Sequence, residues 1–113
     1  MKIFYPAVFE TAEEGGYTVQ VPDLPGCITE GDTLEEAMWM AQDAIGSWLF
    51  DVAETDYPPA SGVNDIDTSE YKDFFVTLVE FDSRIYEERC HALQRAKAFL
   101  QAEQEDLPLA ATA

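Results

Sequence analysis

The pattern of apolar and polar residues at the start of the chain predicts an antiparallel β-hairpin. Residues 3–10 are typical of a strand, in which Pro6 indicates an edge position or a β-bulge because proline has no backbone N–H to donate. Gly15 and Gly16 supply the positive φ angles that a tight turn needs. Residues 17–21 alternate apolar and polar side chains, so they are expected to return as a half-buried strand.

A sharp turn and a capped helix are predicted next. Pro25–Gly26 is a strong turn pair, and residues 27–30 are typical of a short strand. Thr33 and Glu36 have the spacing of a capping box, in which the threonine hydroxyl accepts a hydrogen bond from the third amide of the helix. Apolar residues then recur at helical spacing, so we expect a helix from Thr33 to about residue 53 that lies on the sheet.

Two aromatic residues of this predicted helix lie away from its apolar stripe. The stripe consists of residues spaced three or four apart: Leu34, Met38, Ala41, Ile45, Trp48, Leu49 and Val52. At about 100° per residue, Trp39 and Phe50 fall on the opposite side, with Asp43 and Gly46 between them. Two interpretations stay open: the aromatic side chains pack beneath another part of the chain, or they form a surface for a partner or for self-association.

The second half of the chain predicts a polar connection, a strand and a second helix. Residues 54–73 are polar and hold two prolines and a glycine, which end the first helix. Residues 74–81 form the most apolar strand, and because both of its faces are apolar we expect it to be central in the sheet or covered on both sides. Residues 83–104 have a helical apolar stripe, and residues 107–113 are expected to be a mobile tail.

These elements predict an α+β fold with the order β-β-β-α-β and a C-terminal helix. The length of 113 residues suits one compact domain. We assign residues 1–82 to this domain and residues 83–113 to the C-terminal helix with its tail.

Charge limits what such a domain can bind. The chain has 23 Asp and Glu against 6 Lys and Arg, a net charge of −17. Residues 1–82 carry 18 of these acids against Lys2 and Lys72, while residues 83–113 are nearly balanced. An acidic surface repels nucleic-acid phosphates and attracts basic partners. The alternative is that the acidity only confers solubility.

Cysteine use and hydropathy indicate a reduced, cytoplasmic location. Cys27 and Cys90 are far apart and form neither a disulfide framework nor a CxxC metal motif. Cys27 is expected to be a small buried apolar residue. The N-terminus does not resemble a signal peptide, and no apolar run approaches the ~20 residues that span a membrane.

The ionisable residues do not form a recognisable catalytic or metal site. A ribonuclease-H-type metal centre needs clustered carboxylates, but the two main strands offer only Glu10 and Glu80. Residues 64–70 resemble a calcium loop but lack its glycine at the sixth position and its distal glutamate. His91 follows Cys90 directly, and adjacent helical residues point in different directions. We therefore expect no enzyme activity and no cofactor.

Four short segments in succession resemble the HicB antitoxin family: residues 5–10, 15–17, 21–27 and 30–37. Their order and close spacing carry the resemblance, which covers about residues 3–52 with support from the strand at 74–81. It implies a partial ribonuclease-H-like sheet without ribonuclease activity. It also implies a small basic RNA-cleaving toxin, HicA, as the partner, and assembly into dimers or tetramers.

The C-terminal segment departs from the family pattern. Many members carry a ribbon-helix-helix or helix-turn-helix segment that binds operator DNA. A ribbon-helix-helix needs a polar strand and two helices, whereas residues 83–113 predict one helix, so DNA binding is not expected here. Four basic residues of this helix either pair with the acidic domain and suit the helix C-terminus or are a remnant DNA contact: Arg84, Arg89, Arg95 and Lys97.

The main hypothesis is an antitoxin-like protein that neutralises a basic toxin by occluding its RNA-binding surface. The alternative is a stand-alone oligomeric or RNA-binding module of the same fold without a toxin, although the charge and the lack of a basic–aromatic patch oppose RNA binding. The candidate residues for partner binding or self-association are Asp23, Trp39, Asp43 and Phe50. Asp23 lies in the turn at residues 21–27, which either presents it to a partner or is only a rigid turn.

Overall fold

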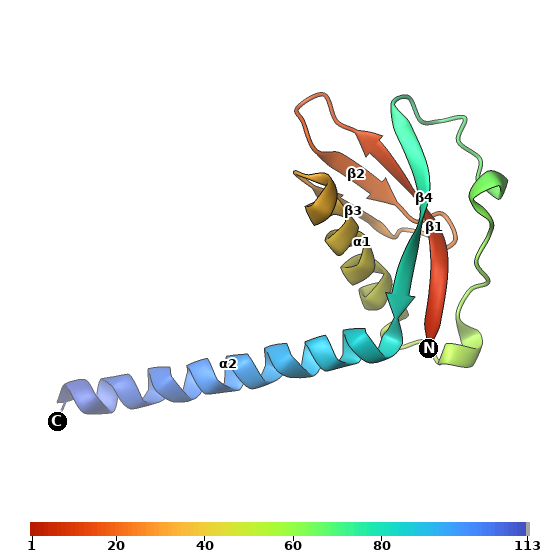
Figure 1. Cartoon of the computed structure of the whole chain (residues 1–113). Helices are drawn as coiled ribbons and strands as arrows, with labels where there is room; N and C mark the ends of the chain where they lie inside the picture. The colour runs from red at the N-terminus through yellow and green to blue at the C-terminus, as the bar shows by residue number, and fades with distance from the viewer. Residues whose placement is uncertain (113) are drawn as a thin grey trace. The chain divides into compact units, whose positions relative to one another are not determined.

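A four-stranded antiparallel sheet forms the centre of the fold. The computed structural model describes the backbone of residues 1–112 and the side chains of residues 1–102. Within these residues the strands lie in the order β3-β2-β1-β4 (Figure 1). The strands are β1 (Lys2–Thr11), β2 (Tyr17–Gln20), β3 (Ile28–Gly31) and β4 (Phe74–Asp82). The helices are α1 (Leu34–Leu49) and α2 (Ser83–Thr112), with short 3₁₀ turns at Glu54–Asp56 and Val63–Asp65. The predicted α+β class and element order are confirmed.

The chain divides into two compact units. The first is Met1–Ser83, and the second begins at Arg84 and consists of helix α2. The helix that was predicted to end near residue 104 continues to Thr112, so most of the expected tail lies within it, and Ala113 lies outside the described residues. The assignment of residues 1–82 as a separate domain stays a prediction.

Helix α1 covers one face of the sheet, and the apolar core lies between them. The core side chains of the sheet include Tyr5, Phe9 and Val19, which are 0% exposed. Helix α1 contributes its own buried side chains: Ala37, Ala41, Ile45 and Leu49. A Cβ added to Gly31 of β3 would collide with the backbone of Ala37, so the absence of a side chain at Gly31 lets the helix start close to the sheet.

The ends of helix α1 agree with the sequence prediction at one end and differ at the other. Thr33 Oγ1 accepts a hydrogen bond from the backbone N–H of Glu36 at 3.1 Å, which confirms the predicted cap. The helix ends at Leu49 rather than near residue 53, because the chain enters a turn in which Val52 N donates to Leu49 O at 3.0 Å. Gly46 is buried rather than on the outer side, so the buried stripe is wider there than predicted.

The prediction that Pro6 marks an edge position or a β-bulge is wrong, because β1 is an inner strand and pairs with β4 in unbroken register through Pro6. The β1–β4 ladder is closed at its ends by Ser83 N donating to Met1 O at 2.9 Å and by Thr11 N donating to Asp73 O at 2.8 Å. Because hydrogen bonding alternates along an antiparallel ladder, the nitrogen of Pro6 points away from β4. On that side β2 pairs with β1 only from Val8 onward. No strand of the described chain therefore needs an N–H from Pro6.

The prediction that the strand at residues 74–81 is central is wrong. In the described sheet β4 is an edge strand, with β1 as its strand neighbour. Val79 and Phe81 are buried in the core, but Phe74, Phe75 and Leu78 are 37%, 38% and 44% exposed. Both faces of this strand are only partly covered, because Phe75 lies on the same face as the buried Val79 and Phe81, while on the other face the ring of Phe74 contacts that of Tyr71.

Candidate protein-interaction surface

Asp23 anchors the connection between α1 and β4. Its Oδ2 accepts a hydrogen bond from the backbone N–H of Ser61, and its Oδ1 accepts one from the Ser61 hydroxyl, both at 2.7 Å. The side chain of Asp23 is half-buried in the loop after β2. Its carboxylate therefore binds this chain's own connection, which favours the rigid-turn interpretation of the segment at residues 21–27.

Tyr5 forms a second tie to the same connection. Its hydroxyl donates a hydrogen bond to the carbonyl oxygen of Pro58 at 2.8 Å. Burial raises the pKa of the Tyr5 hydroxyl to about 12, with further increases from the negative charge of Asp23 and from Tyr57. The hydroxyl therefore stays protonated and keeps donating this hydrogen bond up to strongly alkaline pH.

Further along the connection, Tyr71 and Lys72 at its other end form hydrogen bonds with the sheet. The Tyr71 hydroxyl donates to Gln20 Oε1 at 3.0 Å, and the backbone N–H of Lys72 donates to Glu10 Oε2 at 3.1 Å. The polar connection at residues 54–73 is thus an ordered strap beside the sheet, visible in green on the right of Figure 1.

The other three candidate residues lie along one side of helix α1, with Phe50 at its C-cap. Trp39 and Phe50 are 48% and 73% exposed, and Asp43 is half-buried. Trp39 and Asp43 are one helical turn apart, and Phe50 lies about 16 Å from Trp39 along the helix axis at ~1.5 Å per residue. The structure therefore groups these three on the outer side of α1 and leaves Asp23 apart from them. Whether they contact a partner stays a prediction.

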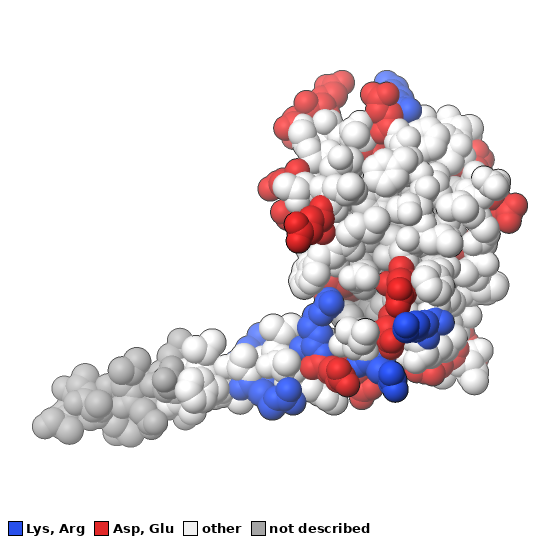
Figure 2. All heavy atoms as spheres, in the orientation of Figure 1, with Lys and Arg blue, Asp and Glu red and all other residues white. Residues whose placement is uncertain are grey.

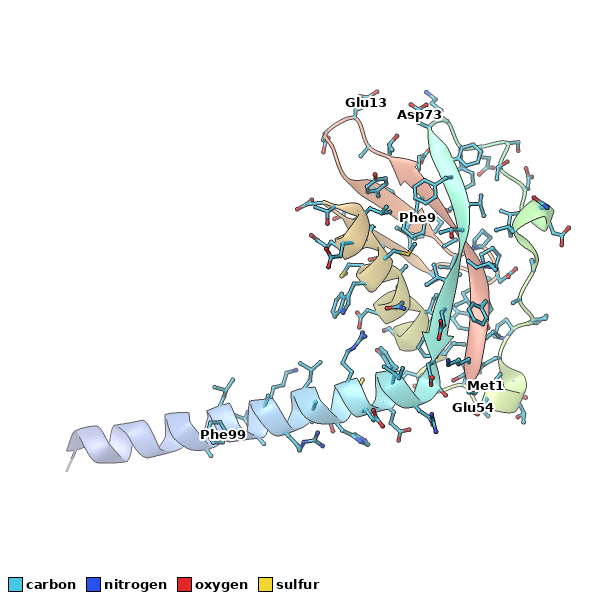
Figure 3. All side chains as sticks on the ribbon, viewed as in Figure 1. Met1, Phe9, Glu13, Glu54, Asp73 and Phe99 are labelled. Atoms are coloured by element: carbon cyan, nitrogen blue, oxygen red, sulfur yellow. The ribbon has the colours of Figure 1, made fainter. Side chains whose placement is uncertain are left out.

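The sheet gathers acidic residues from three separate segments at one of its ends. The β1–β2 turn, the β3–α1 junction and the start of β4 meet there because Thr11 pairs with Tyr17, Tyr17 pairs with Gly31, and Glu10 pairs with Phe74. We call this region the acidic end, and it consists of Glu10, Glu13, Glu14, Glu30, Asp32, Glu35, Glu36, Glu70 and Asp73. Glu13 and Asp73 mark it in Figure 3, and red atoms gather there in Figure 2.

The charge of the acidic end is open to solvent. All of its carboxylate residues except the half-buried Glu10 are exposed. The one basic residue among these segments is Lys72. With nine exposed or half-exposed carboxylates and one lysine, this end has an excess of negative charge that attracts a basic partner.

Sequence reasoning located the acidity in residues 1–82 but missed the acidic end. Its members are scattered over residues 10–73, and each group looks like ordinary turn or cap chemistry. The signal that could have found it is positional: acids flank the turn after the first strand and the start of the helix, and antiparallel pairing brings those points to one end.

The described residues form neither a metal site nor a membrane-spanning helix. Among its described side chains, no three of His, Cys, Asp and Glu are grouped as a metal site would require. In that same part, neither helix has the length and apolarity to cross a bilayer. Cys27 is 5% exposed and burial raises the pKa of its thiol, as expected for a small buried apolar residue.

Comparison with known proteins identifies the family. The family model described as HicB-like antitoxin of bacterial toxin–antitoxin system matches residues 5–95. This chain belongs to the HicB-like antitoxin family. The match includes the whole sheet from Tyr5 onward, helix α1 and the first turns of α2.

Relatives of this HicB-like chain include phage and bacterial proteins. An uncharacterized 14.9 kDa protein of Haemophilus phage HP1 is 42% identical over 83 residues, which are 71% of this chain and 62% of the phage protein. Antitoxin HicB 1 of Photorhabdus laumondii is 56% identical over 41 residues, which are 36% of this chain and 26% of that antitoxin. The HicB-like chain thus spans less than two thirds of the length of these relatives.

A solved structure shares the fold. A chain of the toxin–antitoxin complex from Streptococcus pneumoniae superposes with a TM-score of 0.62 at 24% identity, covering 76% of the HicB-like chain and 73% of that chain. The likeness therefore extends beyond the short segments that carried the resemblance in the sequence.

Proposed function

We propose that this HicB-like protein is a non-enzymatic antitoxin that binds a small basic toxin of the HicA type and blocks the toxin's access to RNA. The observation that carries the proposal is the acidic end, which has nine carboxylate residues and one lysine. Membership of the antitoxin family and the shared fold with a chain of a toxin–antitoxin complex support it. We further propose that it acts in the cytoplasm as a homo-oligomer.

The mechanism needs binding but no covalent chemistry. A protein that cleaves RNA must attract phosphates, which it does with lysine and arginine side chains. The acidic end offers carboxylates to the same basic groups, so antitoxin and RNA compete for one surface. Long-range attraction speeds the encounter, and the bulk of the domain then excludes the RNA chain.

Trp39 and Phe50 are proposed to add affinity to this encounter. Charge alone steers association but gives modest binding energy, because exposed ion pairs are solvated and screened. Large aromatic side chains that become buried at an interface dominate binding energy in many complexes. Helix α1 begins at the acidic end and carries both aromatics on its outer side, so one partner can contact all three features.

The proposal is tested by an RNA-cleavage assay with the product of the adjacent gene, if that gene encodes a small basic protein. The toxin is assayed alone and with a molar excess of this protein. We expect a stable complex in co-purification and loss of cleavage at stoichiometric antitoxin. Undiminished cleavage in the presence of excess folded antitoxin would show that the neutralisation proposal is wrong.

A further inference from the structure

The outer edge of β4 carries backbone groups that face away from the rest of the described sheet. The hydrogen bonds that close the β1–β4 ladder use odd-numbered residues, so the N–H and C=O groups of the even-numbered residues point away from β1. A hydrogen bond from helix α1 supports this orientation: Gln42 Nε2 donates to the carbonyl oxygen of Glu80, which points away from β1, at 3.0 Å. Phe74, Val76 and Leu78 therefore direct their backbone groups to the side where the described sheet has no further strand.

Between Phe74 and Val79, before the Glu80 carbonyl that Gln42 covers, this edge lacks the features that normally prevent strand pairing. Exposed edges are usually short, charged or interrupted by proline or a bulge. Strand β4 has nine residues, and its stretch from Phe74 to Val79 has neither charge nor proline. Phe74 and Leu78 are 37% and 44% exposed on the face away from α1, with the half-buried Val76 between them. Charged residues flank this apolar stretch: Lys72 and Asp73 precede it, and Glu80 and Asp82 follow it.

We propose that β4 pairs antiparallel with β4 of a second copy of this chain, around a two-fold axis at Val76. In this register Val76 lies opposite the Val76 of the second copy, and Phe74 lies opposite Leu78. Lys72 lies opposite the second copy's Glu80, twice in the dimer because of the symmetry. Apolar cross-strand pairs and opposite charges both stabilise a sheet, so this edge is complementary to itself.

Neighbouring symmetric registers are less favourable. An axis at Phe75 places Lys72 opposite Leu78, so the lysine has no acidic partner across the interface. An axis at Thr77 places Lys72 opposite Asp82 but places the apolar Phe74 opposite Glu80. The register centred on Val76 is the one of the three that matches apolar with apolar and basic with acidic positions.

A second copy suits this edge better than a basic toxin does. The apolar stretch of β4 offers no carboxylate to a basic partner, and its one flanking cation, Lys72, would repel such a partner. The inference specifies the interface of the proposed homo-oligomer and does not depend on toxin binding. Two chains of charge −17 repel each other at long range, so the dimer is expected to become tighter as salt increases.

The first test measures dimerisation of the full chain without a partner, by sedimentation velocity across protein and salt concentrations. Lys72→Glu and Glu80→Lys each place two like-charge pairs in the interface, and each should weaken the dimer at least about fivefold. The double variant Lys72→Glu/Glu80→Lys restores opposite charges in exchanged positions and should return the dimer to near its original affinity.

A control separates the interface from a contact within one chain. Glu80 also forms an ion pair with Lys2, with 3.5 Å between Glu80 Oε1 and Lys2 Nζ, and Glu80→Lys abolishes this pair. Lys2→Gln removes the same ion pair without changing the proposed cross-strand pairs, so it should leave the dimer unchanged. Circular dichroism of every variant checks that the fold is kept.

The second test reads the register by disulfide cross-linking in a Cys90→Ser background. Val76→Cys should cross-link to itself, because residues in a directly opposed hydrogen-bonded pair have Cα atoms ~5.5 Å apart, within the range of a disulfide. Leu78→Cys should not, because in this register each Leu78 faces Phe74 and the two copies of residue 78 are four positions out of register.

Three results would overturn the proposal. One is a wild-type chain that stays monomeric at concentrations up to about 1 mM at high salt. Another is a dimer that neither single charge variant weakens, which would place the contact elsewhere, for example on α2. The third is efficient cross-linking by Leu78→Cys without cross-linking by Val76→Cys. None of these results depends on toxin inhibition. The β4–β4 dimer and the neutralisation of a toxin can therefore be disproved independently of each other.

Discussion

Both carboxylate oxygens of Asp23 bind Ser61, one through the backbone N–H and one through the hydroxyl, at 2.7 Å each. This pair joins the loop after β2 to the middle of the 54–73 connection, 38 residues further along the chain. The connection therefore has a defined path although its composition is that of a flexible loop. An acid that sequence inspection offered as a partner contact has a structural role here.

Replacing Asp23 should destabilise the fold. Asp23→Ala removes two hydrogen bonds to a charged acceptor and leaves the Ser61 N–H without its partner, so we expect a loss of about 2–3 kcal/mol in the free energy of unfolding. Urea denaturation followed by circular dichroism measures it. Asp51→Ala, at an exposed position just after α1, is the matched control and should change stability by less than about 0.5 kcal/mol. Equal stability of the two variants would contradict the anchoring role.

Gly31 should tolerate no side chain. Gly31→Ala forces its Cβ into the Ala37 backbone, so either the strand or the start of α1 must move, and we expect a loss of about 1–3 kcal/mol. Gly62→Ala is a suitable control, because its Cβ would meet only the movable carboxylate of Asp65. Thermal unfolding of both variants compares them. A Gly31→Ala protein as stable as wild type would show that α1 is less closely packed on β3.

The Tyr5 hydroxyl should make stability fall at alkaline pH. Its pKa is about 12 in the folded chain against 10.0 for the ordinary group, so between these values the unfolded chain releases this proton and the folded chain keeps it. The stabilisation is complete below pH 10 and is lost as pH rises toward 12. Tyr5→Phe should flatten this part of the pH–stability curve, measured by urea denaturation at several pH values. An identical slope in the variant would contradict the assignment.

Neutralising the acidic end should slow toxin association. Glu13→Gln/Glu14→Gln removes two exposed charges from the β1–β2 turn, and we expect a several-fold lower association rate that is most evident at low salt. Asp51→Asn/Asp56→Asn removes the same charge beyond the C-terminal end of α1 and should have a smaller effect. Stopped-flow or surface-based kinetics can compare the pairs. Equal effects would mean that only net charge matters.

The outer side of α1 should contribute to partner binding or self-association without supporting the fold. Trp39→Ala and Phe50→Ala together should weaken association by about tenfold or more, while the unfolding transition stays close to that of wild type. Ile28→Ala, at a 59% exposed position on β3, is an apolar control that should leave association unchanged. Titration calorimetry with the toxin and sedimentation of the free protein separate the two kinds of association. Unchanged values in both would exclude this surface.

Local chemistry made much of the fold predictable. The Thr33 cap depends on residues three positions apart, and the glycine pair before Tyr17 marks its turn directly in the sequence. The position of β4 was not predictable in this way, because apolar residues on both faces look the same whether the second face meets the core, a partner or water. The contact of Asp23 with Ser61 and the acidic end depend on pairing between distant segments, which no local pattern contains.

The long β1–β4 ladder also has a consequence for how the chain folds. Strands β1, β2 and β3 and helix α1 are consecutive, so their contacts close short loops, whereas β4 pairs with residues 64 to 80 positions away, from Glu10–Phe74 to Lys2–Asp82. Closing so large a loop is entropically slow, and during synthesis β4 leaves the ribosome after all of its partners. The N-terminal hairpin and helix can therefore collapse first. The edge of β1 that faces away from β2 then stays unpaired until β4 has been synthesised.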